Sequence, residues 1–125
     1  MARTLTIRIK PAAEVLKDFR GTFKALQAGR PVGRREGIYF TSIEAARNLL
    51  TPNRLALLRA VRAHRPGSIY DLAKRVERDL KNVQDDLRVL ERYGLVSLTN
   101  GRGTGKRRVR VPRARFNEIS LKIAI

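Results

Sequence analysis

The chain contains no cysteine and only one histidine. Without cysteine it has no disulfide framework, no thiol nucleophile and no cysteine-based zinc finger. A single histidine leaves no transition-metal cluster to propose, and His64 follows a basic helix end, where such a residue usually interacts with the helix dipole or solvent. We therefore expect no metal site.

The sequence also lacks a recognisable catalytic constellation. Asp85 and Asp86 are adjacent, so on a helix they project about 100° apart and cannot face each other as an acid–base pair. The glycine-rich stretch from Gly101 falls short of a phosphate-binding loop, because only three residues separate it from Gly105 and an arginine follows the lysine. We predict no enzyme and no cofactor.

No apolar run approaches the ~20 residues that span a bilayer. The N-terminus has no apolar segment typical of a secretory signal. We expect a cytoplasmic protein of prokaryotic type that associates with the nucleoid.

Acidic residues are few. The chain has 28 Lys and Arg against 11 Asp and Glu, for a formal net charge of +17. Arginine outnumbers lysine by 21 to 7, which suits bidentate contacts with phosphate and guanine, although a GC-rich genome gives the same bias. The apolar fraction of 42% predicts a folded core rather than a disordered basic tail. A polyanionic partner is therefore expected.

Two helices are predicted between Ser68 and Gly94. Ser68 can cap the first, with Asp71 at the capping-box spacing, and Asp79 can cap the second. Apolar residues of the second helix form one stripe at a period of 3.6, namely Leu80, Val83, Leu87 and Leu90. Polar residues lie opposite or beside that stripe, namely Lys81, Asn82, Gln84, Asp85, Arg88 and Arg92. Such a face is suited to contacting base edges in a major groove, and it also suits an ordinary solvated helix surface.

A basic β-hairpin is predicted after these helices. Its strands are residues 95–98 and 107–111, joined by a glycine-rich tip. Residues 101–113 include six Lys or Arg and no acid. This segment favours the DNA interpretation of the preceding helix.

The helix pair and basic hairpin together resemble the winged helix–turn–helix of prokaryotic transcriptional regulators. The runs Asp71-Leu-Ala-Lys-Arg-Val76 and Leu90-Glu-Arg-Tyr-Gly-Leu-Val96 are similar to that family's pattern. The resemblance implies an α+β fold and a sequence-specific, duplex DNA-binding repressor that acts as a homodimer. Base edges would be contacted by Lys81, Asn82, Gln84, Asp85 and Arg88, and the DNA backbone by Ser68, Arg78 and Arg92. The wing would grip the backbone or the minor groove through Arg102, Lys106, Arg107 and Arg108.

Asp85 is the one acid on the predicted recognition face. Its carboxylate repels phosphate but can accept a hydrogen bond from cytosine N4, which would make it a specificity determinant. The alternative is an intrahelical ion pair with Lys81, Arg88 or Arg92.

The predicted domains are a strand–helix extension at 1–28, a linker at 29–36, the winged domain at 37–113 and a C-terminal strand at 114–125. Within the winged domain, Thr41 and Thr51 are predicted to cap two scaffold helices, and Leu55, Leu58 and Val61 to point inward from the second.

The two ends of the chain carry apolar surface that needs cover. A strand at residues 5–9 and a helix at 12–28 are too small to be stable alone. They are expected to pack on the winged domain, on a second copy or on another protein. The C-terminal strand should pair with residues 5–9 of its own chain, of a second subunit, or with another protein's sheet edge. Predicted partner contacts are Phe19, Phe23, Leu121 and Ile123.

A narrower resemblance rests on the run Arg78-Asp-Leu-Lys-Asn-Val83 and the apolar terminal strand. These look like the DNA-binding antitoxins of toxin–antitoxin systems, which implies an autorepressor that also binds a toxin. Two other functions stay open: an architectural, chromatin-like DNA-binding protein, and an RNA- or ribosome-associated winged protein. The shortage of aromatics for base stacking counts against RNA.

Overall fold

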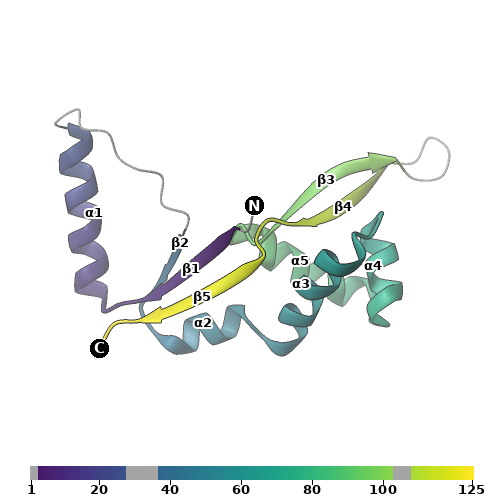
Figure 1. Ribbon diagram of the computed structural model, residues 1–125, viewed down its shortest axis with the longest axis horizontal. Helices are drawn as coiled ribbons and strands as arrows, with labels where there is room; N and C mark the ends of the chain where they lie inside the picture. The colour runs from purple at the N-terminus through teal and green to yellow at the C-terminus, as the bar shows by residue number, and fades with distance from the viewer. Residues whose placement is uncertain (1–2, 28–36, 103–107) are drawn as a thin grey trace. The chain divides into compact units, whose positions relative to one another are not determined.

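The computed structural model describes residues 3–27, 37–102 and 108–125. Over these residues the chain is α+β, with five helices, a three-stranded parallel sheet and a β-hairpin (Figure 1). It divides into two compact units. We call residues 4–48 and 118–125 the sheet unit, and residues 1–3 and 49–117 the helical unit.

The sheet unit has β1 (Thr4–Ile9) at its centre, between β2 (Gly37–Phe40) and β5 (Glu118–Ile123). Both neighbours run parallel to β1. The alternation of the sequence places Leu5, Ile7 and Ile9 on one face, where each is at most 6% exposed. The C-terminal strand therefore pairs with residues 4–9 of its own chain, the first of the three partners left open by the sequence.

Two helices accompany this sheet. The helix α1 (Ala12–Gln27) lies within one residue of its predicted bounds. The helix α2 (Ile43–Leu49) begins after Ser42, whose hydroxyl oxygen accepts a hydrogen bond from the Ala45 amide at 3.2 Å. The prediction of Thr41 as this cap was wrong by one residue, because α2 begins at Ile43 and the amide of its first turn binds the hydroxyl of Ser42.

The helical unit consists of α3 (Pro52–His64), α4 (Ile69–Val76), α5 (Leu80–Arg92) and the antiparallel hairpin of β3 (Val96–Arg102) and β4 (Arg108–Ala114). The apolar stripes of its helices and the base of the hairpin supply the core. Its most deeply buried apolar side chains are Leu57, Val61, Leu72, Val83, Leu87, Leu90, Leu95 and Val96. The prediction of the inward side of α3 was correct only in part. Val61 is buried as expected, but Leu55 and Leu58 are half-buried. The other buried leucine of this helix is Leu57, which was not predicted.

Three of the predicted helix signals are confirmed. Thr51 caps α3 by accepting from the Arg54 amide at 3.2 Å, and Ser68 caps α4 by accepting from the Asp71 amide at 3.0 Å. Gly94 follows α5 with a φ of 78°, a left-handed conformation that glycine adopts without strain. Asp79 occupies the N-cap position of α5, but its side chain makes no capping hydrogen bond, so that part of the prediction was wrong.

The hairpin strands are longer than predicted. β3 continues through Arg102, and β4 continues past Pro112 to Ala114. Proline is tolerated there because β4 pairs with only one strand among the described residues, so the missing N–H need not interrupt the ladder.

The two units also group the chain differently from the predicted domains. β2 and nearly all of α2 belong to the sheet unit, whereas the sequence placed everything from residue 37 to 113 together. Residues 37–40 pair with β1, and such a long-range partner is not visible in a short strand's own sequence. Within the described residues, no helix has the length and apolar character required to cross a membrane.

Candidate nucleic-acid interface

The helix α5 has a sharply divided surface. Val83, Leu87 and Leu90 are fully buried, which fixes the rotation of the helix in the unit. The opposite side is therefore turned to solvent, and the exposed side chains there are Lys81, Asn82, Asp85, Arg88 and Arg92. Gln84 lies at the margin and is half-buried.

The polar residues of this face are not engaged elsewhere in the described part of the chain. The side chains of Lys81, Asn82, Gln84 and Arg88 make no hydrogen bond or ion pair with the described residues. The same holds for Asp85, so the intrahelical pair with a basic neighbour does not form there. The face thus presents donors from Lys81, Arg88 and the side-chain amides, and acceptors from those amides and the Asp85 carboxylate, that a ligand can use.

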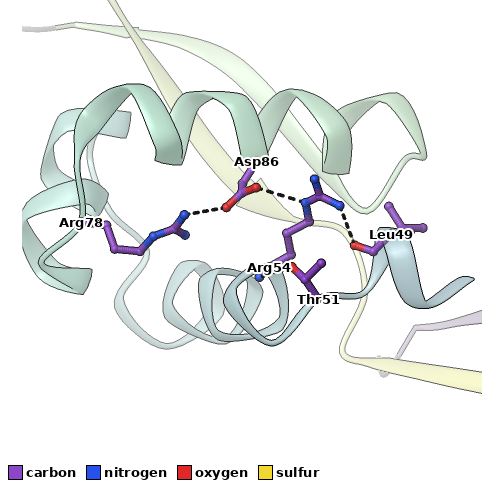
Figure 2. A network of polar contacts seen from close by, with 5 residues as sticks. All are labelled: Leu49, Thr51, Arg54, Arg78 and Asp86. Atoms are coloured by element: carbon purple, nitrogen blue, oxygen red, sulfur yellow. Dashed lines mark hydrogen bonds and ion pairs between the residues drawn. The ribbon is translucent and has the colours of Figure 1, made fainter.

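The next residue, Asp86, points the other way and joins three parts of the helical unit (Figure 2). Its carboxylate accepts a hydrogen bond from Arg54 Nε at 3.1 Å and from Arg78 Nη2 at 2.7 Å. Arg54 also donates from Nη1 to the Leu49 carbonyl at 3.2 Å. The side chains of the ion-paired residues are only 17–24% exposed, so the pairs are partly shielded from solvent. Together they tie α5 to the start of α3 and to the turn before α5.

This network changes the role expected of Arg78. The sequence predicted that Arg78 contacts the DNA backbone, but its Nη2 is bound to Asp86, and its Nη1 is buried without a hydrogen-bond partner among the described residues. A guanidinium held in this way is not presented to a phosphate. Sequence reasoning missed this because the pairing depends on how the α4–α5 turn folds back on α5.

The start of α4 carries a second polar cluster. Ser68 is half-buried, and because its oxygen only accepts from Asp71, its hydroxyl hydrogen stays available for a phosphate oxygen. The Asp71 carboxylate accepts from the Gly67 amide at 3.1 Å and from Arg75 Nε at 3.3 Å. The hydrogen bond from Gly67 is the largest cause that lowers the pKa of Asp71, with Arg75 next in the same direction.

The hairpin adds exposed cations. Arg108 and Arg110 are both exposed and lie two residues apart on β4, so they project from the same face. The β3 residue opposite Arg108 is Arg102, whose side chain lies outside the described ones, as do the predicted wing residues Lys106 and Arg107. Arg110 was missed in the sequence analysis, although basic and apolar residues alternate from Arg108 to Val111, a pattern that places Arg110 on the same exposed face as Arg108.

Other arginines near the hairpin donate hydrogen bonds to backbone carbonyls of the helical unit. Arg113 donates from Nη1 to the Pro66 carbonyl at 3.2 Å, which ties β4 to the turn between α3 and α4. Arg115 donates from Nη1 to the Gly94 carbonyl at 3.3 Å, at the end of α5. These contacts hold the hairpin and α5 in one unit.

On α4, the exposed Tyr70 ring lies under Lys74, with Nζ 5.4 Å from the ring centroid. The sequence analysis did not single out this pair. It places an aromatic ring and a cation on the solvent side of α4.

The predicted partner contacts lie in the sheet unit. Phe19 of α1 is 67% exposed, and Leu121 and Ile123 of β5 are 48% and 50% exposed. The side chain of Phe23 lies outside the described ones. These residues remain predictions as partner contacts, but the described ones are accessible.

Metal-ligating residues do not cluster in the part of the chain that the structure describes, where no group of three or more His, Asp or Glu is placed to hold an ion.

Comparison with known proteins adds one match. No curated protein matches the chain, and no solved structure matches it. The sequence model of the HVO_A0114 family matches residues 49–119. This range begins at the first residue of the main segment of the helical unit and ends just past its last residue, Asn117. The match covers more than half of the 125 residues, and the chain belongs to the HVO_A0114 family.

Proposed function

We propose that the helical unit is a winged helix–turn–helix domain that binds duplex DNA sequence-specifically, and that the protein regulates transcription. In this proposal α4 and α5 form the helix–turn–helix, α3 supports them and the β3–β4 hairpin is the wing. The main support for this proposal is the exposed face of α5. The side chains of Lys81, Asn82 and Arg88 are unpaired there within the described chain, and the apolar stripe from Val83 to Leu90 on the opposite side of the helix is fully buried.

The chemistry of this face suits base edges. Arginine and lysine donate to guanine O6 and N7, and asparagine and glutamine pair with adenine N6 and N7. Arg88 and Lys81 are therefore assigned to guanine, and Asn82 to adenine, with Gln84 at the margin. Asp85 is exposed and unpaired within the described residues, which leaves its carboxylate available to cytosine N4.

Contacts to the DNA backbone are assigned to residues around this face. Arg92 is exposed near the end of α5, and Arg108 and Arg110 are exposed on the hairpin. Ser68 can donate its hydroxyl hydrogen at the start of α4. We withdraw Arg78 from this group because Asp86 holds it. Phosphate contacts of this kind position the protein, while base contacts carry the sequence preference.

A second candidate function follows from the net charge of +17. An architectural protein that coats DNA needs many cations and little base readout. It differs from a regulator in one measurable quantity, the ratio of affinities for a specific and a scrambled duplex.

The test is a fluorescence-anisotropy titration of the full chain with labelled DNA from its own upstream region, a scrambled duplex and a structured RNA, at two salt concentrations. An autoregulating repressor is expected to prefer its own region by at least ~10³-fold at moderate salt. Equal affinities for both duplexes that fall together with salt would support the architectural function instead. RNA that competes as well as duplex DNA would overturn both.

Two variants sharpen this test. Arg88→Ala should reduce the preference for the upstream duplex over the scrambled one, because it removes a base contact. Arg59→Ala is the matched control: Arg59 is exposed on α3, half a turn away from the buried Leu57 and Val61 and thus on the outer side of that helix. If Arg88→Ala and Arg59→Ala behave alike, α5 does not read bases.

A further inference from the structure

The strand β5 lies at the edge of the parallel sheet. It pairs with β1 on one side, and no described strand lies on its other side (Figure 1). An edge strand offers unpaired N–H and C=O groups to another strand, and proteins usually protect such edges. β5 has no proline or bulge-forming glycine that would prevent pairing.

The backbone of β5 shows which groups face this edge. The Ala124 amide donates to the Ile9 carbonyl of β1 at 3.1 Å. Successive residues of a strand point their amides to alternate sides, so the amides and carbonyls of Ile119, Leu121 and Ile123 point away from β1. These are the groups that a further strand would bind.

The side chains of β5 separate by chemistry. Ile119, Leu121 and Ile123 lie on the apolar face of the sheet, with Leu121 48% and Ile123 50% exposed. The other face carries Glu118, Ser120 and Lys122. From Glu118 to Lys122 the side chains are acidic, apolar, polar, apolar and basic in turn. When a second copy of this segment runs in the opposite direction, each acid therefore meets a base and each apolar residue meets an apolar residue.

We propose that β5 is a homodimer interface at which two copies of the chain pair their β5 strands antiparallel about a two-fold axis through Ser120. Glu118 then lies opposite Lys122 of the partner subunit, and the reciprocal pair forms by symmetry. Ile119 lies opposite the partner's Leu121 on the apolar face. The sheets of the two copies become continuous, and the exposed apolar side chains of β5 gain cover.

Charge and backbone direction select this register together. With the axis at Ser120, the outward-facing Ile119 and the partner's Leu121 form a hydrogen-bonded pair. Glu118 and the partner's Lys122 fall in a non-hydrogen-bonded pair, where side chains approach more closely. Moving the axis by one residue along the strand sets Glu118 opposite the partner's Ser120 or Ala124 and loses both ion pairs. A self-complementary pattern of this kind favours a second copy of the chain over an unrelated strand.

This inference goes beyond the proposed DNA binding and does not depend on it, because the association is measured without DNA. Sedimentation equilibrium of the full chain is expected to show a dimer. Lys122→Glu and Glu118→Lys each place two like-charge pairs across the axis, and each is expected to weaken dimerisation by roughly tenfold or more. The double variant Glu118→Lys with Lys122→Glu is expected to restore it.

Mixing the two single variants gives a sharper result. One variant then has two bases and the other two acids at these positions, so the mixture is expected to form a heterodimer although each variant alone dissociates. Lys17→Glu is the matched control: Lys17 is exposed on α1, and this change alters net charge equally while leaving β5 intact. A monomeric wild type, single variants as dimeric as the control, or a double variant that stays dissociated would each overturn the proposal.

Discussion

The Asp86 carboxylate and the Arg78 Nη2 are 2.7 Å apart, and the same carboxylate binds Arg54 Nε at 3.1 Å. Because these arginines come from different parts of the helical unit, one acid on α5 fixes the helix to both α3 and the α4–α5 turn. Asp85, one residue earlier, is exposed on the other side of α5. Of these two adjacent acids, Asp86 therefore binds arginines within the helical unit, and Asp85 lies on the proposed DNA surface.

Asp86→Asn is expected to destabilise the protein by about 2–3 kcal/mol, because it leaves two partly buried guanidinium groups without their counter-charge. Asp85→Asn is the matched control, since it makes the same chemical change at an exposed, unpaired position, and is expected to cost less than about 0.5 kcal/mol. Urea denaturation followed by circular dichroism measures both. Equal losses for the two variants would show that the ion pairs add nothing.

Local sequence signals predicted much of the helical unit. Of the predicted stripe, Val83, Leu87 and Leu90 are buried as expected, because a period of 3.6 leaves few other ways to cover these side chains, whereas Leu80 at the start of α5 is 37% exposed. The caps Thr51 and Ser68 are also where the sequence placed them. Each of these signals is contained within a few residues, and so a single sequence can show it.

Features that depend on distant partners were not predictable. The pairing of β2 with β1 removes residues 37–40 from the domain in which the sequence placed them. The role of Arg78 changes because Asp86 lies within reach only once α5 has packed. Arg110 is different, because it lies within the predicted strand at 107–111 and alternates with buried Val111, so its exposure could have been inferred from the sequence.

On the proposed DNA-binding mode, Arg110→Ala should lower the slope of log affinity against log salt by about one, because it removes one phosphate contact and the counterions released with it. The affinity loss should be nearly the same for the upstream and scrambled duplexes. Titrations at several salt concentrations give the slope, and Arg59→Ala again serves as the control. A slope unchanged from the wild type would place Arg110 away from the DNA.

Asp85→Ala should strengthen binding to a scrambled duplex by about threefold, because it removes a carboxylate from a surface that faces phosphates, a gain of about 0.6 kcal/mol. If Asp85 also accepts from a cytosine, the same variant should lose discrimination at one base pair of the specific site. Anisotropy with both duplexes separates the two effects. Unchanged affinity for the scrambled duplex would mean that Asp85 does not face DNA.

The hydrogen bond from the Gly67 amide, with Arg75 as the next contributor in that direction, lowers the pKa of Asp71 in the folded protein. A carboxyl group with a lowered folded pKa stabilises the fold above its unfolded pKa of about 3.9, and this contribution disappears as the pH falls through the folded pKa. The wild type should therefore be more stable than Asp71→Asn at neutral pH, and the difference should shrink as the solution is acidified below the ordinary aspartate range. Urea titrations of both proteins at matched pH values measure the difference, in which the titration of all other groups cancels. A gap that stays constant down to low pH would show that the ionised carboxylate at the start of α4 does not stabilise the fold.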